Sequence, residues 1–189
     1  MKTEASTRLM LTAEAYWEYV KRLIKDLKIK QIGEGSYAQV FQHPKLKNIV
    51  VKLVLHDEEY LKFARFAMDN PKNPWLPRIA AIEPIKFDGS RLSNSSNSYL
   101  VFLEKLQPTS FELQKSLIWK LVDTYELHIH AFTPKWFSKS SWKKLALNSK
   151  DPGLAQFAAF AAKNFNQLDI NSANVMARGR QLVFTDPIA

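Results

Sequence analysis

Residues 32–41 read IGEGSYAQVF and place a glycine loop between two stretches of strand-forming residues. Gly33 and Gly35 carry no Cβ, so backbone N–H groups can approach the oxygen atoms of a phosphate at these positions. A plain hairpin turn is the alternative interpretation, because glycine patterns of this kind are common. In both cases we expect strands at about 28–33 and 36–42, joined through the loop.

A lysine interrupts the next apolar run. Residues 49–55 read IVVKLVL, which predicts a third strand at about 48–55 that is covered on both faces. A buried ammonium group is costly unless it is paired, so Lys52 is expected to hold phosphate oxygens and a helix carboxylate. An edge-strand lysine that reaches solvent is the alternative. Glu59 is the first choice for the carboxylate and Glu58 the second, since both begin the next expected helix.

Two polar residues with a telling spacing lie near the end of the sequence. Residues 168–176 read LDINSANVM, and Asp169 and Asn174 have the spacing with which kinases orient an attacking hydroxyl and bind metal. Asp186 follows twelve residues after Asn174, behind the apolar residues 182–184. Carboxylate and amide oxygens are hard ligands that suit Mg²⁺. An Asx turn is the alternative for the Asp169 loop taken alone.

The remaining patterns predict a sheet-rich half followed by a helical half. Further elements are expected at about 12–28 (helix), 57–70 (helix), 79–87 and 98–104 (strands), 110–131, 138–148 and 152–166 (helices), and in a closing hairpin that turns at 177–180. The sequence therefore predicts an α+β protein of protein-kinase-like bilobal fold. Its antiparallel, β-rich nucleotide-binding lobe with one inserted helix occupies residues 1–105, and its reduced helical lobe occupies residues 106–189.

The order of these signals matches what phosphoryl transfer requires, namely a phosphate cradle, a cation, a positioning carboxylate and metal ligands around one ATP. The predicted site comprises Gly33, Glu34, Gly35, Ser36, Tyr37, Val40, Lys52 and Glu104 as contacts to ATP, Asp169, Lys52 and Glu59 as catalytic residues, and Asn174 and Asp186 as ligands of Mg²⁺.

These stretches, with HPKL at residues 43–46, VVK at 50–52 and FTDP at 184–187, resemble the early serine/threonine protein kinases of T-seven-like bacteriophages. The resemblance extends from the glycine loop to the last residues and is strongest at its two ends. It implies an ATP- and Mg²⁺-dependent kinase that modifies proteins in the cytoplasm of the host cell. Lys52, Asp169, Asn174 and Asp186 carry over by motif position.

Two departures from that family fall in one loop, and one region of ordinary protein kinases has no counterpart. Asn171 stands where the family usually has His, and Ala173 stands where it has Gly. A backbone that requires positive φ at Ala173 would be strained, which implies weaker activity. No activation segment follows Asp186. We therefore expect a peptide platform built from residues 110–166 or supplied by a partner, or a sequence that continues further.

Composition narrows the possible locations and binding partners of the protein. The sequence has no cysteine, no apolar run long enough to cross a membrane and no secretory segment, which fits a cytoplasmic protein. A net charge of +9 favours phosphate-bearing ligands, nucleic acid or acidic partners. Residues 135–144 mix lysine with aromatic residues, but no nucleic-acid motif accompanies them. We favour a helix there with buried tryptophan and a solvated lysine face.

Three functions are compatible with the sequence. The first is a serine/threonine protein kinase of minimal size that phosphorylates host proteins. The second is a catalytically weak kinase-fold module that binds and inhibits a host protein through its basic surface. The third is a small-molecule phosphotransferase, ranked last because such enzymes usually need a larger helical lobe to enclose their substrate.

Overall fold

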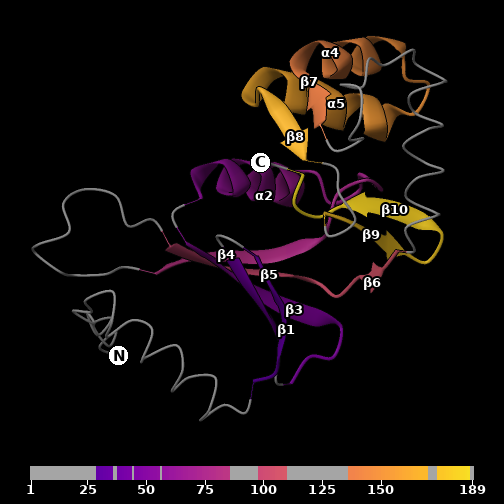
Figure 1. Cartoon of the computed structure of the whole chain (residues 1–189). Helices are drawn as coiled ribbons and strands as arrows, with labels where there is room; N and C mark the ends of the chain where they lie inside the picture. Colours follow the sequence, from indigo (N-terminus) through magenta and orange to yellow (C-terminus); the bar gives the residue numbers. More distant parts are fainter. Residues whose placement is uncertain are drawn as a thin grey trace, which may run out of the picture. The chain divides into compact units, whose positions relative to one another are not determined.

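The computed structural model describes residues 29–35, 38–43, 45–55, 57–85, 98–109, 136–169 and 174–187. Within these ranges the protein is α+β, with three helices and three antiparallel sheets (Figure 1). The helices expected at 12–28 and 110–131 lie outside the described residues, as does the expected loop at 88–97.

The chain divides into two compact units. The sheet unit comprises Met1–Glu58 and Ile79–Lys105, and the helical unit comprises Glu59–Arg78 and Leu106–Ala189. The helix that follows the third strand therefore belongs, apart from its first residue, with the helical unit rather than with the sheet that flanks it in sequence.

The sheet unit is built on five antiparallel strands, which confirms the predicted five-stranded lobe. The strands are β1 (Gln31–Glu34), β2 (Ala38–Gln42), β3 (Ile49–Leu55), β4 (Ile79–Ile85) and β5 (Ser98–Glu104), in the spatial order β1-β2-β3-β5-β4. The β-branched run in β3 explains its central place, because such side chains pack well on both faces of a pleated sheet.

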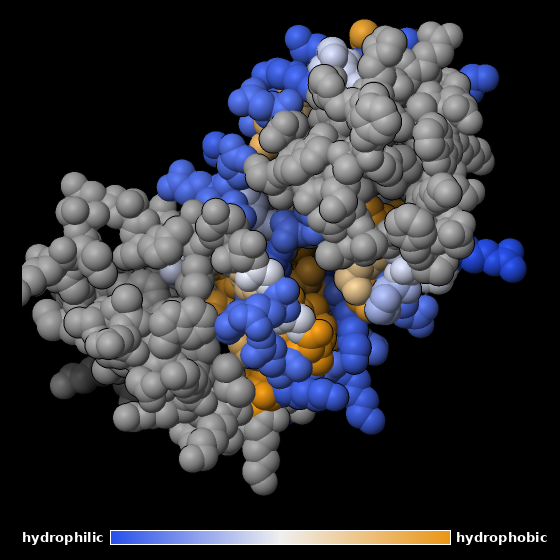
Figure 2. Space-filling model, in the orientation of Figure 1, coloured by the Kyte–Doolittle hydropathy of each residue, from blue (hydrophilic) through white to orange (hydrophobic). Residues whose placement is uncertain are grey.

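Apolar side chains from the three inner strands form the core of this sheet. Phe41, Leu53, Val54, Val101 and Leu103 are all buried. Hydrophobic surface also gathers over β3 and β1, with hydrophilic residues beside it (Figure 2). The strands at the β1 end of the sheet therefore keep apolar surface accessible on the face shown.

Three helices and four short strands make up most of the described helical unit. They are α2 (Glu58–Asp69), α4 (Lys139–Asn148), α5 (Pro152–Asn164), β7 (Trp136–Ser138), β8 (Gln167–Asp169), β9 (Val175–Arg178) and β10 (Gln181–Phe184). The start of α5 is determined locally. Asp151 is its N-cap and accepts a 3.0 Å hydrogen bond from the Leu154 amide, while Pro152 opens the first turn.

The closing hairpin pairs β9 with β10, as predicted. Arg178 and Gln181 flank its two-residue turn, where Gly179 adopts φ 62°. This left-handed conformation is the reason for a glycine at the turn. The two-residue strand β6 (Gln107–Pro108) adds a third strand beside β9, and β7 pairs separately with β8. The sequence patterns did not predict these two short pairings.

An aromatic cluster forms the core of the helical unit. The ring of Phe157 on α5 lies 4.7 Å from that of Phe184 on β10 and 5.4 Å from that of Trp142 on α4. Phe63 of α2 meets Phe157 edge to face, with ring centroids 6.3 Å apart. One phenylalanine therefore joins three helices to the end of the hairpin. None of the described helices has the length and apolar character needed to span a bilayer.

Removing that side chain tests the cluster. Phe157 is fully buried, so Phe157→Ala should lower the free energy of unfolding by about 3–5 kcal/mol through lost burial and a residual cavity. Leu147→Ala, at a side chain that is 84% exposed, is the matched control and should change it by less than about 0.5 kcal/mol. Urea denaturation followed by tryptophan fluorescence measures both. Equal effects of the two substitutions would contradict the assigned core.

Candidate functional site

The glycine loop is a tight turn between β1 and β2. Gly33 lies opposite Val40 and Glu34 opposite Gln39, and the Gly35 amide donates a 2.8 Å hydrogen bond to the Ala38 carbonyl. The hairpin is therefore held by backbone contacts on both sides of its tip. Ser36 and Tyr37, expected to contact ATP, lie outside the described residues.

The fold itself does not require glycine at either position. A Cβ at Gly33 would lie 3.5 Å from the Val40 Cβ, and one at Gly35 would lie 3.9 Å from the Ala38 carbonyl oxygen. Both are ordinary contact distances, and neither backbone has a positive φ. Among the described residues, neither a steric contact nor the backbone conformation requires glycine at these two positions.

Lys52 lies in the middle of the central strand. It faces Val40 of β2 on one side and Val101 of β5 on the other, and only 6% of its surface is exposed. Val50 and Val54, which share its face of β3, are also buried. The edge-strand alternative is therefore wrong, since β3 is paired along both edges. A buried ammonium group in such surroundings needs anionic partners.

The predicted glutamates Glu104 and Glu59 occupy different places. Glu104 is the half-buried last residue of β5, opposite Ile49, and the next amide, that of Lys105, donates a 2.8 Å hydrogen bond to the Asn48 carbonyl. It therefore lies where the chain leaves the sheet unit. Glu59 is exposed in the first turn of α2 and belongs to the helical unit, and Glu58 is exposed beside it.

The backbones of the two predicted metal ligands, Asn174 and Asp186, lie close together at the open end of the β9–β10 hairpin. Val175 pairs with Phe184, and one step further the Thr185 amide donates a 2.8 Å hydrogen bond to the Asn174 carbonyl. The Asp186 amide is 3.5 Å from the same oxygen. Asn174 and Asp186 are both half-buried.

The backbone of Asp169 is also placed by a strand. It is the last residue of β8 and lies opposite Trp136 of β7. Residues 170–173, which include Asn171 and Ala173, lie outside the described residues. The structure thus fixes both ends of the predicted catalytic loop, Asp169 at the end of β8 and Asn174 at the start of the hairpin.

A proline-rich segment, NPKNPWLPR at residues 70–78, supports the hairpin and was not recognised from the sequence as part of the site. We call it the proline loop. The Phe184 amide donates a 2.9 Å hydrogen bond to the Trp75 carbonyl, and the Arg178 guanidinium donates to the carbonyls of Pro74 and Leu76 at 3.2 and 2.9 Å. The sequence feature that could have indicated the importance of this loop is Asn73, a polar residue among prolines. Its side chain is buried in the structure.

The donor set fits a hard cation that keeps other ligands. Across the described ranges, no group of three or more histidine, aspartate or glutamate side chains is placed to hold a metal ion. The pair Asn174 and Asp186 would supply one amide oxygen and one carboxylate. Mg²⁺ prefers six oxygen ligands and usually takes several from water and substrate phosphates. The pair is therefore suited to a metal–nucleotide complex rather than to a permanently bound ion.

No protein-family model matches the chain, and no curated protein matches it.

The two loop glycines can be tested separately from function. Gly33→Ala and Gly35→Ala should leave the free energy of unfolding unchanged or raise it by up to about 1 kcal/mol, because the unfolded chain loses freedom and no clash arises. Gly153→Ala should destabilise instead, since its Cβ would lie 2.9 Å from both Asn73 Oδ1 and Pro74 Cδ. Thermal unfolding compares the three variants. Strong destabilisation by Gly33→Ala or Gly35→Ala would show that the fold does require these glycines.

Proposed function

We propose that this chain is a minimal serine/threonine protein kinase that transfers the γ-phosphoryl group of ATP, with Mg²⁺, to proteins of a bacteriophage host. The observation that carries the proposal is the placement of Asn174 beside Asp186, joined through the Asn174 carbonyl. The chain resembles the early kinases of T-seven-like bacteriophages in the motifs around these residues. A protein-kinase-like bilobal fold and action in the host cytoplasm are parts of the same proposal.

Metal binding is supported by geometry and chemistry together. Antiparallel pairing of β9 with β10 holds the two backbones in register, and Pro187 restricts Asp186 to an extended conformation. A rigid pair of one amide and one carboxylate oxygen offers Mg²⁺ part of its octahedral shell. ATP phosphates and water would complete it.

Phosphate binding is supported by the sheet unit. The Gly33 and Gly35 positions leave the hairpin backbone open to a phosphate, and Lys52 is a buried cation directly opposite Val40 on the adjacent strand. Phosphate oxygens would add anionic partners to this buried ammonium group. Glu104, at the end of β5, and Val40 are proposed to line the rest of the nucleotide site.

The transfer step assigns a role to Asp169. The oxygen of a substrate serine or threonine attacks the γ-phosphorus, the bond to the β–γ bridging oxygen breaks, and ADP leaves. In this proposal Asp169 orients the hydroxyl and accepts its proton, and Lys52, paired with Glu59, offsets charge on the phosphates. Asn174 and Asp186 would hold Mg²⁺, which would supply further positive charge to the phosphates.

A second function is favoured by α4. Residues 136–150 contain four lysines and no acidic residue, Lys139 and Lys143 are exposed, and Leu147 is 84% exposed. Trp142 on the same helix is buried and so offers no stacking platform for bases. This surface suits an acidic protein partner better than nucleic acid. A kinase-fold module with little activity could inhibit a host protein through it.

One labelling experiment separates the two functions. Host lysate with labelled ATP and Mg²⁺ should show phosphorylated host proteins with the unmodified protein and none with Lys52→Met, Asp169→Asn or Asp186→Ala. Lys52→Met keeps the length of the side chain but not its charge. Absence of labelling by the unmodified protein, with host toxicity retained by all three variants, would instead support the binding module.

Metal dependence distinguishes the roles of the two aspartates. Asp186→Ala should weaken MgATP binding by about tenfold or more, because it removes a metal ligand, whereas Asp169→Asn should change it by less than about twofold. Isothermal titration calorimetry measures both, and repetition with ATP in EDTA is the control, in which the two variants should bind equally. Equal MgATP affinities of the two variants would contradict the assignment.

A further inference from the structure

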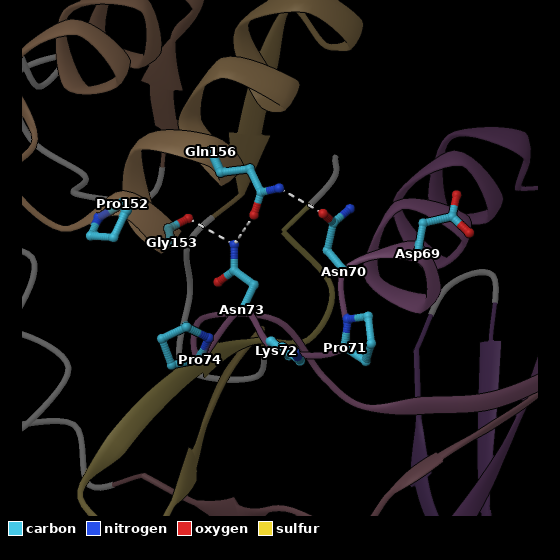
Figure 3. A pocket seen from close by; sticks show the side chains of 9 residues that line it. All are labelled: Asp69, Asn70, Pro71, Lys72, Asn73, Pro74, Pro152, Gly153 and Gln156. Carbon is cyan, nitrogen blue, oxygen red and sulfur yellow. Dashed lines mark hydrogen bonds between the residues drawn. The ribbon is translucent and has the colours of Figure 1, made fainter.

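Asn73 is the best-connected polar side chain of the proline loop. Its Nδ2 donates to the Gly153 carbonyl at 2.8 Å and to Gln156 Oε1 at 2.9 Å, and its Oδ1 accepts a 3.0 Å hydrogen bond from the Trp75 amide. Figure 3 shows the first two bonds and the further bond from Gln156 to Asn70. Both amide protons of Asn73 are therefore used, although only 7% of its surface is exposed.

Two successive hydrogen bonds connect Asn73 with the β9–β10 hairpin. Asn73 fixes the Trp75 amide, and the Trp75 carbonyl accepts the amide of Phe184 at 2.9 Å. The Trp75 ring also stacks on that of Phe184, with centroids 5.8 Å apart. Asp186 lies two residues beyond Phe184. Trp75 therefore contacts the last residue of β10, two residues before Asp186.

The loop is held from the α5 side through Asn73 and from the hairpin side through Arg178. On the α5 side, Asp151 accepts a hydrogen bond from Trp75 Nε1 at 3.1 Å, and Gly153 leaves no room for a Cβ beside Asn73. Asn73 also lies at the inner wall of an open hollow of about 680 Å³, whose outer residues include Lys72 and Asp69. Lys72 lies in the same loop and lines the same hollow, but it is exposed.

We propose that Asn73 is a positioning residue for the metal ligand Asp186. By fixing Trp75 against α5, it determines where β10 ends and so where the Asp186 carboxylate meets a metal ion. This inference rests on the proposed function, because it takes Asp186 to be a metal ligand. A purely structural role would instead lower stability without a selective effect on metal binding.

The test measures metal binding, nucleotide binding and local opening separately. Mn²⁺ replaces Mg²⁺, and electron paramagnetic resonance reports its affinity in the presence of ATP. Asn73→Ala and the milder Asn73→Ser should each weaken Mn²⁺ binding, Asn73→Ala by about tenfold, as expected for a group that supports a metal ligand. Binding of ATP in EDTA should stay within about twofold, and hydrogen exchange of the Phe184 amide should accelerate. Lys72→Ala should match the unmodified protein in all three measurements.

The outcomes separate the two proposals. If the unmodified protein binds no Mn²⁺ with ATP, the proposed function fails and the inference with it. If the unmodified protein binds Mn²⁺ and the folded Asn73→Ser variant binds it equally well, the inference alone is overturned. An equal loss of Mn²⁺ binding and of metal-free ATP binding would also overturn it, because that result indicates a general structural defect.

Discussion

The hydrogen bond between the Thr185 amide and the Asn174 carbonyl is the constraint on which the proposed chemistry depends. It extends the β9–β10 ladder by one step and places the backbone of Asn174 opposite Thr185, one residue before Asp186. Side chains at the end of a paired hairpin are held far more closely than side chains on an unsupported loop. In phosphoryl transfer a metal ion neutralises charge on the phosphates, so the placement of its ligands matters. The proposed chemistry therefore depends most on the geometry of the β9–β10 hairpin.

The rest of the helical unit supports this hairpin from two directions. The aromatic cluster supplies apolar burial, since Phe184 at the end of β10 packs against Phe157, Trp142 and Trp75. The proline loop supplies directional hydrogen bonds along the free edge of β10. Apolar packing alone does not determine the orientation of a strand, whereas hydrogen bonds do, because they prefer a narrow range of distances and angles. Together they explain why a segment between a helix and a strand of the sheet belongs to the helical unit, and why a buried asparagine occurs among its prolines.

The sequence predicted the elements whose signals are local. The run IVVKLVL predicted β3 to within one residue, Asp151 and Pro152 predicted the start of α5, and Gly179 predicted the closing turn. It did not predict β6 or the β7–β8 pair, because strands of two or three residues carry no periodicity. It also did not show that α2 packs with the helical unit, since an amphipathic face does not identify its partner. Among site residues, the pairing of Asn174 and Asp186 as metal ligands stays a prediction. The hydrogen bonds of Asn73 could not be predicted, because they join it to residues about 80 positions away.

Paramagnetic relaxation tests most directly the proposal that the glycine loop and Asp186 bind one metal–ATP complex. The ¹⁵N-labelled protein is titrated with MnATP, with MgATP as the diamagnetic reference. We predict that the Gly33 and Gly35 amide signals broaden with MnATP, because the metal and the phosphates are parts of one complex, and that this broadening is lost in Asp186→Ala. Sharp Gly33 and Gly35 signals at saturating MnATP would contradict the account.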